Sequence, residues 1–394
     1  MNYSFSDKIK HLKPSAIREI LKHTSNPGII PFAAGNPAAE SFPIAQMEEI
    51  AADIFKNNPV QAFQYSITEG YPPLREKTRA RLAEKWDSVK EFDDLIIVSG
   101  GQQGIDLTCK VLCNEGDTVI CENPSFIGAL NAFRSYNVNL SGIPLEDDGM
   151  DINALENALK TQKNVRFIYI IPTFQNPAGI CTSFNKRKAI YKLAQKYNVF
   201  ILEDNPYGEL RFSGENIPAI KSMDTDGRVV YAGSYSKILS AGIRLGFVCA
   251  PSEIISKITV AKQVNDVHTN IFFQILADEF ISRYGLDNHI ENIKAIYRRK
   301  SALMLDGIER HFPENIKYSR PEGGLFVWCR APEGTDIFAL ASRLIEKKVA
   351  IVPGGAFVAD ENMPCFAFRL NFSTPSDEQI VRGIEILGDE LKLL

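Results

Sequence analysis

Two apolar runs, at residues 228–232 and 247–250, flank the sequence Gly233-Ser234-Tyr235-Ser236-Lys237-Ile238-Leu239-Ser240-Ala241-Gly242-Ile243-Arg244-Leu245-Gly246. We therefore expect a loop between two buried strands, and such loops are where catalytic groups tend to lie. A lysine beside cationic or desolvating neighbours, as Lys237 would be, loses its proton and becomes a nucleophile. Arg244 and the serine hydroxyls suit a phosphate, because a guanidinium binds phosphate oxygens in a fork and hydroxyls donate to them.

Two other interpretations of this stretch are open. Most lysines are solvated surface residues, and Lys237 taken alone would be one of them. The run Ser234-Tyr235-Ser236-Lys237 also fits the Ser-x-x-Lys pattern of penicillin-binding enzymes, which further require Ser-Asp-Asn and Lys-Thr-Gly elements. Neither tripeptide occurs in the chain, and the motifs upstream favour a different chemistry.

Length and composition indicate an ordinary globular protein. The chain has 394 residues, 45% hydrophobic and 23% charged, which is enough material for two domains or for one large domain with an appendage. The formal net charge is −4, so there is no electrostatic reason to expect nucleic acid or an anionic membrane as a partner. We expect neither partner.

The scattered cysteines and histidines favour a reducing compartment and no metal site. The seven cysteines form no Cys-x-x-Cys pair, and the five histidines form no His-Glu-x-x-His pattern. Residues 1–7 lack the apolar core of a secretory signal. No apolar run reaches the ~20 residues that span a bilayer. We therefore expect a cytoplasmic protein without a bound metal.

From residue 95 onward, apolar strands alternate with helices. Apolar runs predict strands at 95–98, 118–121, 138–143, 165–171, 199–202, 229–232 and 247–250, and helical spacing predicts helices at 105–112, 126–135, 152–159 and 186–197. This alternation predicts an α/β fold, in which a large domain contains a mostly parallel sheet flanked by helices.

The remaining segments predict an N-terminal arm and a second domain. Helical spacing predicts helices at 8–23, at 44–57, through the stretch 271–310, at 338–347 and at 377–391, with short strands at 323–329 and 366–372. We expect residues 1–44 to form an N-terminal arm and helix that pack with the small domain. Residues 45–285 would form the large domain, and residues 286–394 a smaller α+β C-terminal domain.

Several turns follow the predicted parallel strands, where ligands of such sheets collect. The turn Gly100-Gly101-Gln102 leads into a helix and would aim backbone N–H groups at an anion, although plain helix capping explains it too. Asp204 ends a buried strand, where an unpaired carboxylate is costly unless it meets a cation such as a pyridinium. Capping of a turn is the alternative role for Asp204.

Taken together, these motifs resemble the fold-type-I, pyridoxal-phosphate-dependent class I/II aminotransferases, in the branch of the 2-aminoadipate and kynurenine aminotransferases. A phosphorylated pyridine aldehyde needs a lysine for its Schiff base, a carboxylate at its ring nitrogen, phosphate donors and an arginine for the substrate carboxylate. The resemblance covers nearly the whole chain, from Ser15-Ala16-Ile17-Arg18-Glu19-Ile20 to Phe368-Arg369-Leu370-Asn371-Phe372-Ser373.

The resemblance implies a cofactor role for a set of residues along the chain. Lys237 would form the Schiff base and then carry the proton, and Asp204 would keep the ring nitrogen protonated. Asn176 and Tyr207 would bind the ring hydroxyl oxygen. Phe126 would stack on the ring, where many relatives have tyrosine. The phosphate would be held by Gly101, Gln102, Ser234, Ser236 and Arg244.

The resemblance also implies the substrate contacts and a partner. Arg369 would bind the substrate α-carboxylate, helped by Asn176 and the backbone of Gly35, and Arg18 would serve the side chain of acidic substrates. Tyr65 would reach the phosphate of a neighbouring subunit, which implies a homodimer with shared sites. Relatives often have more glycine and leucine where this chain has Ala33-Ala34, so the identity of the substrate stays open.

The reaction that the resemblance implies is ping-pong transamination between an L-amino acid and a 2-oxo acid, plausibly 2-oxoglutarate. Two rival functions stay open. A pyridoxal-phosphate-dependent β-lyase or decarboxylase would use the same cofactor residues. An aminotransferase-like transcription regulator would need a DNA-binding domain ahead of Arg18, and the mild acidity of the chain disfavours it.

Overall fold

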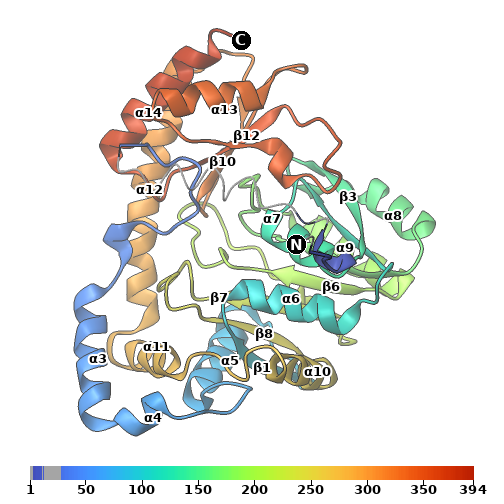
Figure 1. Ribbon diagram of the computed structural model, residues 1–394, viewed down its shortest axis with the longest axis vertical. Helices are drawn as coiled ribbons and strands as arrows, with labels where there is room; N and C mark the ends of the chain where they lie inside the picture. The colour runs from blue at the N-terminus through green and yellow to red at the C-terminus, as the bar shows by residue number, and fades with distance from the viewer. Residues whose placement is uncertain (1–2, 11, 13–27) are drawn as a thin grey trace.

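An eight-stranded sheet forms the centre of the larger part of the molecule (Figure 1). The structure, a computed structural model, describes residues 3–10, 12 and 28–394. In space the strands follow the order β1 (Asp93–Val98), β8 (Gly246–Pro251), β7 (Val229–Ser234), β6 (Phe200–Asp204), β5 (Val165–Ile170), β2 (Thr118–Asn123), β3 (Asn139–Glu146) and β4 (Gly149–Met150).

Most of these strands are parallel. Strands β7, β6, β5, β2 and β3 pair in parallel with their neighbours. Strand β8 runs antiparallel to both β1 and β7, and β4 runs antiparallel to β3. The predicted mostly parallel sheet is therefore confirmed, as is each strand predicted between residues 95 and 250. Because parallel strands share a direction, the residues that follow β2, β5, β6 and β7 meet at one edge of the sheet.

Helices cover both faces of this sheet, because the side chains of each strand alternate between two apolar layers. Cys121, Tyr169 and Leu202 belong to one layer, and Ile120 and Ile168 belong to the other. The first layer packs against α6 (Gly101–Leu112), α7 (Ile127–Arg134) and α10 (Ser252–Gln263), and the second against α8 (Ile152–Thr161) and α9 (Phe184–Tyr197). Helix α5 (Pro72–Trp86) contacts β1 at the edge.

A smaller antiparallel sheet builds the C-terminal part, as predicted. Its strands follow the order β11 (Val352–Pro353), β12 (Ala367–Asn371), β10 (Phe326–Arg330) and β9 (Lys317–Tyr318), and it is accompanied by α12 (Leu286–His311), α13 (Ile337–Glu346) and α14 (Asp377–Leu391). Ile30 pairs with Val349, and the amide of Asn371 donates to Phe32 O over 2.9 Å. Residues 30–32 thus lie beside the small sheet without being one of its strands. The exact domain boundaries proposed at residues 44 and 285 stay predictions.

The structure refines the predicted helices in two places and leaves one of them largely untested. The predicted helical stretch 271–310 consists of two helices, because Gly285, with φ +74°, separates α11 (Ile271–Tyr284) from α12. A short helix, α4 (Pro59–Phe63), follows α3 (Ile44–Asn57) and was not predicted. Of the predicted helix 8–23, the structure describes only α1 (Asp7–Lys10) and residue 12, and the rest lies outside the described residues.

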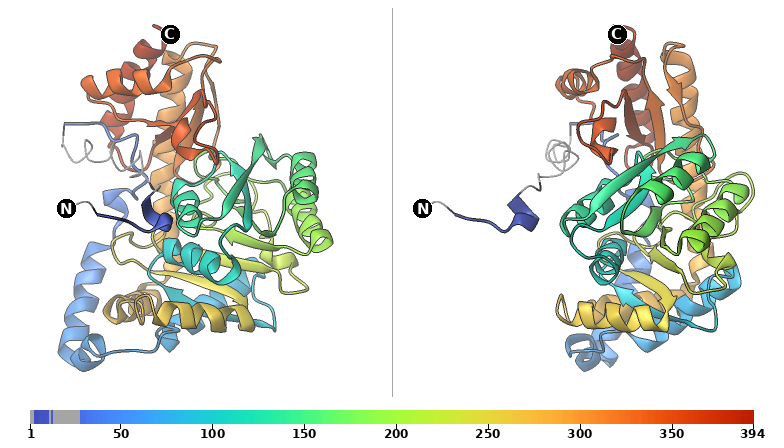
Figure 2. Two further views of the ribbon diagram at one scale, coloured as in Figure 1. Left: turned by 45° about the vertical axis from the view of Figure 1, so that its right-hand side comes forward. Right: turned by 90° about the vertical axis from the view of Figure 1, so that its right-hand side faces the viewer.

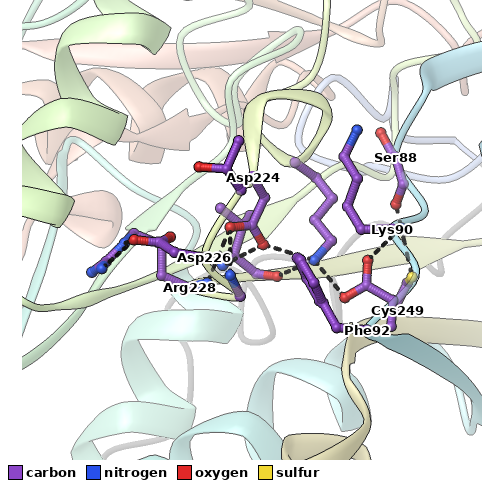
Figure 3. A network of polar contacts seen from close by, with 12 residues as sticks. Ser88, Lys90, Phe92, Asp224, Asp226, Arg228 and Cys249 are labelled. Atoms are coloured by element: carbon purple, nitrogen blue, oxygen red, sulfur yellow. Dashed lines mark hydrogen bonds and ion pairs between the residues drawn. The ribbon is translucent and has the colours of Figure 1, made fainter.

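A buried ion cluster ties the amino ends of two strands of the large sheet. Lys221, in the short helix η2 (Lys221–Met223), donates to Asp93 Oδ1 over 2.8 Å and to Asp224 Oδ2 over 2.9 Å. Its third acceptor is Val229 O, at 2.9 Å. The side chains of these two ion pairs are fully buried. Figure 3 shows Asp224, Phe92 and Arg228 around this cluster, which connects the start of β1 with the start of β7 across the intervening strand β8.

The N-terminal segment of residues 3–10 lies away from the body of the molecule (Figure 2). Tyr3, Phe5 and Ile9 in this segment are exposed. Among the described residues, no helix combines the length and apolar character needed to cross a membrane.

Candidate active site

A cavity of about 740 Å³ lies at the carboxyl ends of the strands and under the small sheet. It is lined by twelve residues that the sequence marked as candidates: Gly35, Gly101, Gln102, Phe126, Asn176, Asp204, Tyr207, Ser234, Ser236, Lys237, Arg244 and Arg369. Two other candidates stand apart. Tyr65 lies in a separate surface hollow, and Arg18 lies outside the described residues. The cavity thus gathers residues that are more than 330 positions apart in the chain.

Lys237 enters the cavity from the loop that follows β7. Its Nζ donates a hydrogen bond of 2.7 Å to the backbone oxygen of Gly35. Burial, together with the nearby cations Arg369 and Arg244, lowers the pKa of Lys237 to about 8. An amine with such a pKa is partly unprotonated at neutral pH, so it can act both as a nucleophile and as a carrier of a proton.

Asp204 is the last residue of β6 and is buried beneath the cavity. Burial raises the pKa of Asp204 to about 7, although a hydrogen bond of 2.8 Å from the hydroxyl of Tyr169 opposes this rise. No lysine or arginine within the described residues forms an ion pair with Asp204, and the hydroxyl of Tyr169 is the side-chain group that acts on its charge. The carboxylate therefore suits a cationic ligand group that enters from the cavity.

An anion cradle forms where α6 begins. Gly101 and Gln102 are the first residues of α6, so their backbone N–H groups point out of the helix end. Gly100, with φ +84°, lies against the guanidinium of Arg244, and a Cβ at Gly100 would overlap it. Arg244 donates to Ser236 Oγ over 3.4 Å. The cradle therefore combines a helix end, a guanidinium and a hydroxyl, which are suitable donors for a phosphate.

Arg369 on β12 presents a guanidinium to the same cavity. Its Nη1 donates to Asn176 Oδ1 over 2.8 Å, and its Nη2 donates to the backbone oxygen of Ala33 over 2.9 Å. Its Nε is buried and has no protein acceptor among the described residues. Burial lowers the pKa of Arg369 to about 10, so the side chain stays cationic at neutral pH. A buried cation with a free donor is suited to a carboxylate ligand.

Aromatic side chains form the walls of the cavity. Phe126 comes directly before α7, and Gly128 leaves the space that its ring occupies. Burial raises the pKa of Tyr207 well above its ordinary value, so its hydroxyl remains a donor. The guanidinium of Arg369 lies 4.2 Å from the ring centroid of Phe326 and 5.1 Å from that of Phe357.

Sequence reasoning missed Tyr169, Asn36, Phe326 and Phe357. Tyr169 pairs in register with Leu202, two residues before Asp204, so the alternation of side chains along the strands could have placed it on the face of Asp204. The contact of Phe326 and Phe357 with Arg369 depends on the register of the small sheet. No local pattern in the sequence reveals that register.

The chemistry of the cavity fits pyridoxal phosphate, and comparisons with known proteins agree. The family model for aminotransferase class I and II matches residues 27–387. The chain is 40% identical to aromatic-amino-acid aminotransferase 1 of Thermococcus litoralis over 98% of this chain and 94% of that protein.

Solved structures of aminotransferases are similar to this chain over nearly its whole length. The kynurenine aminotransferase of Pyrococcus horikoshii, in complex with PMP, superposes with a TM-score of 0.95 at 38% identity, covering 99% of this chain and 97% of that one. The α-aminoadipate aminotransferase LysN of Thermus thermophilus, complexed with N-(5'-phosphopyridoxyl)-L-leucine, has a TM-score of 0.91 at 38% identity, covering 98% of this chain and 97% of that one. The predicted fold and cofactor are therefore confirmed, and the chain belongs to the pyridoxal-phosphate-dependent aminotransferases of class I and II.

Proposed function

We propose that Lys237 binds the cofactor and carries the proton in transamination between an L-amino acid and a 2-oxo acid. The observation that carries this proposal is the position of Lys237, whose amine lies in one cavity with Asp204, the anion cradle and Arg369. Bound pyridoxal phosphate supplies an electrophilic aldehyde carbon and an electron-accepting pyridinium ring. The lowered pKa of Lys237 suits both of its proposed tasks.

The remaining cofactor contacts follow from the donors and acceptors of the cavity. Asp204 pairs with the protonated ring nitrogen, which supplies the cation that this buried carboxylate lacks. Asn176 and Tyr207 donate to the ring hydroxyl oxygen. The phosphate group is held by the N–H groups of Gly101 and Gln102, the hydroxyls of Ser234 and Ser236, and Arg244. Phe126 covers one face of the ring.

Arg369 orients the substrate by binding its α-carboxylate with its unused Nε and an Nη atom. Asn176 and the backbone of Gly35 support this contact. With the carboxylate fixed, Lys237 removes the proton from the substrate α-carbon and returns a proton there in the opposite half-reaction. The amino acid and the 2-oxo acid use the same cavity in turn, which is the basis of ping-pong kinetics.

The cavity offers few free charges to the substrate side chain. Among the described residues, the cationic side chains that line the cavity are Lys237, Arg244 and Arg369, and each already has a role. An acidic side chain would therefore depend on Arg18. The relatives named above act on aromatic amino acids, kynurenine and α-aminoadipate. We propose that this enzyme takes one or more of these amino acids with 2-oxoglutarate as the acceptor.

A panel of amino acids tests the substrate proposal. Aromatic amino acids, kynurenine, 2-aminoadipate, leucine and glutamate are each paired with 2-oxoglutarate, for the wild type and for Arg18→Ala. We expect Arg18→Ala to lose activity with 2-aminoadipate and to keep activity with aromatic donors. An equal loss for both classes contradicts the role of Arg18. Release of pyruvate or carbon dioxide in place of a new amino acid would favour a lyase or a decarboxylase.

We propose further that the enzyme acts as a homodimer in which Tyr65 completes the phosphate site of its partner. Tyr65 is 82% exposed and makes an edge-to-face contact with His268 at 5.9 Å. Nearby, the exposed ring of Phe55 stacks on Phe63 at 5.8 Å and on Phe272 at 5.2 Å. Exposed aromatic clusters of this kind are typical of protein interfaces.

Mixing two defective variants tests the shared site. Lys237→Ala and Tyr65→Ala are unfolded together and refolded together, so that mixed dimers form. If Tyr65 serves the partner, each mixed dimer has one intact site, and activity returns to about a quarter of the wild-type value. If Tyr65 serves its own chain, each of the two sites in a mixed dimer carries one defect, and mixing restores no activity.

A further inference from the structure

The turn that carries the proposed phosphate donors has a second set of contacts, on the side away from the cavity. The backbone N–H of Ser99 donates to Gln103 Oε1 over 2.7 Å, and the Ser99 hydroxyl donates to Asp266 Oδ2 over 2.7 Å. Gln103 Nε2 donates to the same Asp266 oxygen over 2.8 Å. Ser99 and Gln103 flank Gly101 and Gln102, so these bonds hold both ends of the turn.

Lys262 completes this network from α10. Its side chain is fully buried, and its Nζ donates to Gln103 Oε1 over 2.8 Å and to the two oxygens of Asp266 over 2.7 and 2.9 Å. Burying an ammonium is costly, and an apolar side chain would fill the same space at lower cost. Both side-chain partners of Lys262 also hold Ser99. The buried charge of Lys262 therefore serves to hold the turn in place.

The chain after α10 adopts a strained conformation that brings Asp266 into place. Val267 follows Asp266 with φ +67°, a backbone conformation that a β-branched residue rarely adopts. The amides of Asp266 and Val267 both donate to Lys262 O, at 3.0 and 3.2 Å. Val267 is half exposed, so core packing does not explain this conformation. Strain that persists without a packing reason points to a functional constraint.

The hydrogen bonds also keep Asp266 charged. Burial alone would raise its pKa, but the bonds from Lys262, Gln103 and Ser99 hold the pKa of Asp266 below its ordinary value. The turn is thus fixed between two charged groups, with Arg244 against Gly100 on the cavity side and the Lys262–Asp266 pair on the far side.

We propose that Lys262 and Asp266 are positioning residues that hold the Ser99–Gln102 turn in the geometry that binds phosphate. They never touch the cofactor, and they set the affinity for its phosphate group through the aim of the Gly101 and Gln102 N–H groups. The proposal rests on the phosphate role proposed above for this turn. Donors fixed before binding cost no reorganisation when the anion arrives, so loosening them weakens phosphate binding selectively.

The test compares two ligands that differ only in the phosphate group. The affinities of the apo-protein for pyridoxal phosphate and for pyridoxal are measured by absorbance titration, for the wild type, Lys262→Met and Asp266→Asn. We expect both variants to bind pyridoxal phosphate about tenfold more weakly or worse, with pyridoxal affinity changed less than about twofold. Asp266→Asn keeps the shape of the side chain and serves if Lys262→Met does not fold.

Two controls separate the possible outcomes. Lys300→Met removes another buried lysine, which lies in α12 and donates to Pro375 O over 2.6 Å, and it should leave the ratio of the two affinities unchanged. Ser236→Ala should lower the ratio of the affinity for pyridoxal phosphate to the affinity for pyridoxal, because Ser236 lines the proposed phosphate site itself. An unchanged ratio in Ser236→Ala refutes the phosphate assignment. If the ratio falls in Ser236→Ala but stays unchanged in Lys262→Met and Asp266→Asn, the positioning role is overturned. An equal loss of affinity for both ligands in Lys262→Met and Asp266→Asn also overturns it.

Discussion

The hydroxyl of Tyr169 donates a hydrogen bond of 2.8 Å to Oδ2 of Asp204, on the sheet face beneath the cavity. Both side chains are buried, and they come from the adjacent strands β5 and β6. The bond favours the ionised form of Asp204, which burial disfavours. Tyr169 therefore helps to keep available the charge that the proposed pairing with the ring nitrogen requires.

Removing this hydroxyl should move the titration of Asp204 to higher pH. In Tyr169→Phe the opposing hydrogen bond is lost, so the pKa of Asp204 rises, by about one unit for a bond to a charged group. As the pH falls, the affinity for the cofactor should therefore begin to weaken at a higher pH in Tyr169→Phe than in the wild type. The affinity for pyridoxal phosphate is measured from pH 5 to 8. Tyr191→Phe, which removes a hydroxyl bonded to Asp226 at 3.0 Å, is the matched control, and identical profiles for both variants would contradict the role of Tyr169.

The stability of the apo-protein should depend on Asp204 in a direction opposite to that of a carboxylate whose pKa is lowered by an ion pair. Burial raises the folded-state pKa of Asp204 to about 7, above its value in the unfolded chain. The folded state therefore holds this proton more tightly, and the contribution of Asp204 to stability falls as the pH rises from about 4 to about 7. Asp204→Asn should remove this part of the dependence of the free energy of unfolding on pH. Urea unfolding of both apo-proteins at several pH values measures it, and parallel curves for the two proteins would count against a raised pKa.

The amine of Lys237 should react at a lower pH than an ordinary lysine. Its pKa is lowered to about 8 by burial and then by the cations Arg369 and Arg244. Acylation of Lys237 in the apo-protein, followed by mass spectrometry, should therefore reach half its maximal rate near pH 8. Arg369→Met removes one of the two cations and should shift this midpoint upward. A midpoint near 10.5 in the wild type would show that the cavity does not depress the pKa.

The buried cluster around Lys221 should be a major contributor to stability. Lys221→Met leaves the carboxylates of Asp93 and Asp224 without their cation at 0% exposure, and such a change costs about 3–5 kcal/mol. Lys90→Met breaks an ion pair with the exposed Asp87, which contributes about 0–1 kcal/mol, and is the control. Urea unfolding of both variants gives the comparison. Equal free energies of unfolding would mean that the buried cluster adds no more than a surface pair.

Much of the large sheet and of the cavity can be predicted from the sequence, because both depend on local patterns. Apolar runs mark the strands, and the carboxyl ends of parallel strands meet at one edge. The turns that carry Gly101, Asp204 and Lys237 therefore meet there too. Other features depend on contacts that local patterns do not contain. The rings of Phe326 and Phe357 over Arg369 depend on how the small sheet lies on the cavity.

The helical break at Gly285 could not be placed from spacing alone, because apolar residues recur at helical intervals on both sides of it. The helix α4 was missed because its five residues are too few to show a period. The network around Lys262 escaped notice for a different reason. A lysine on a helix usually indicates a solvated face, and only the fold shows that Lys262 is buried and bonded to Gln103 and Asp266.

Chemical trapping shows which lysine holds the cofactor. Purified protein is incubated with pyridoxal phosphate and reduced with borohydride, and the modified peptide is identified by mass spectrometry. Lys237→Ala and the surface variant Lys188→Ala are treated in parallel. We expect one cofactor mass on the peptide that contains Lys237, in the wild type and in Lys188→Ala, and none in Lys237→Ala. Labelling of another lysine while Lys237 stays unmodified would contradict it.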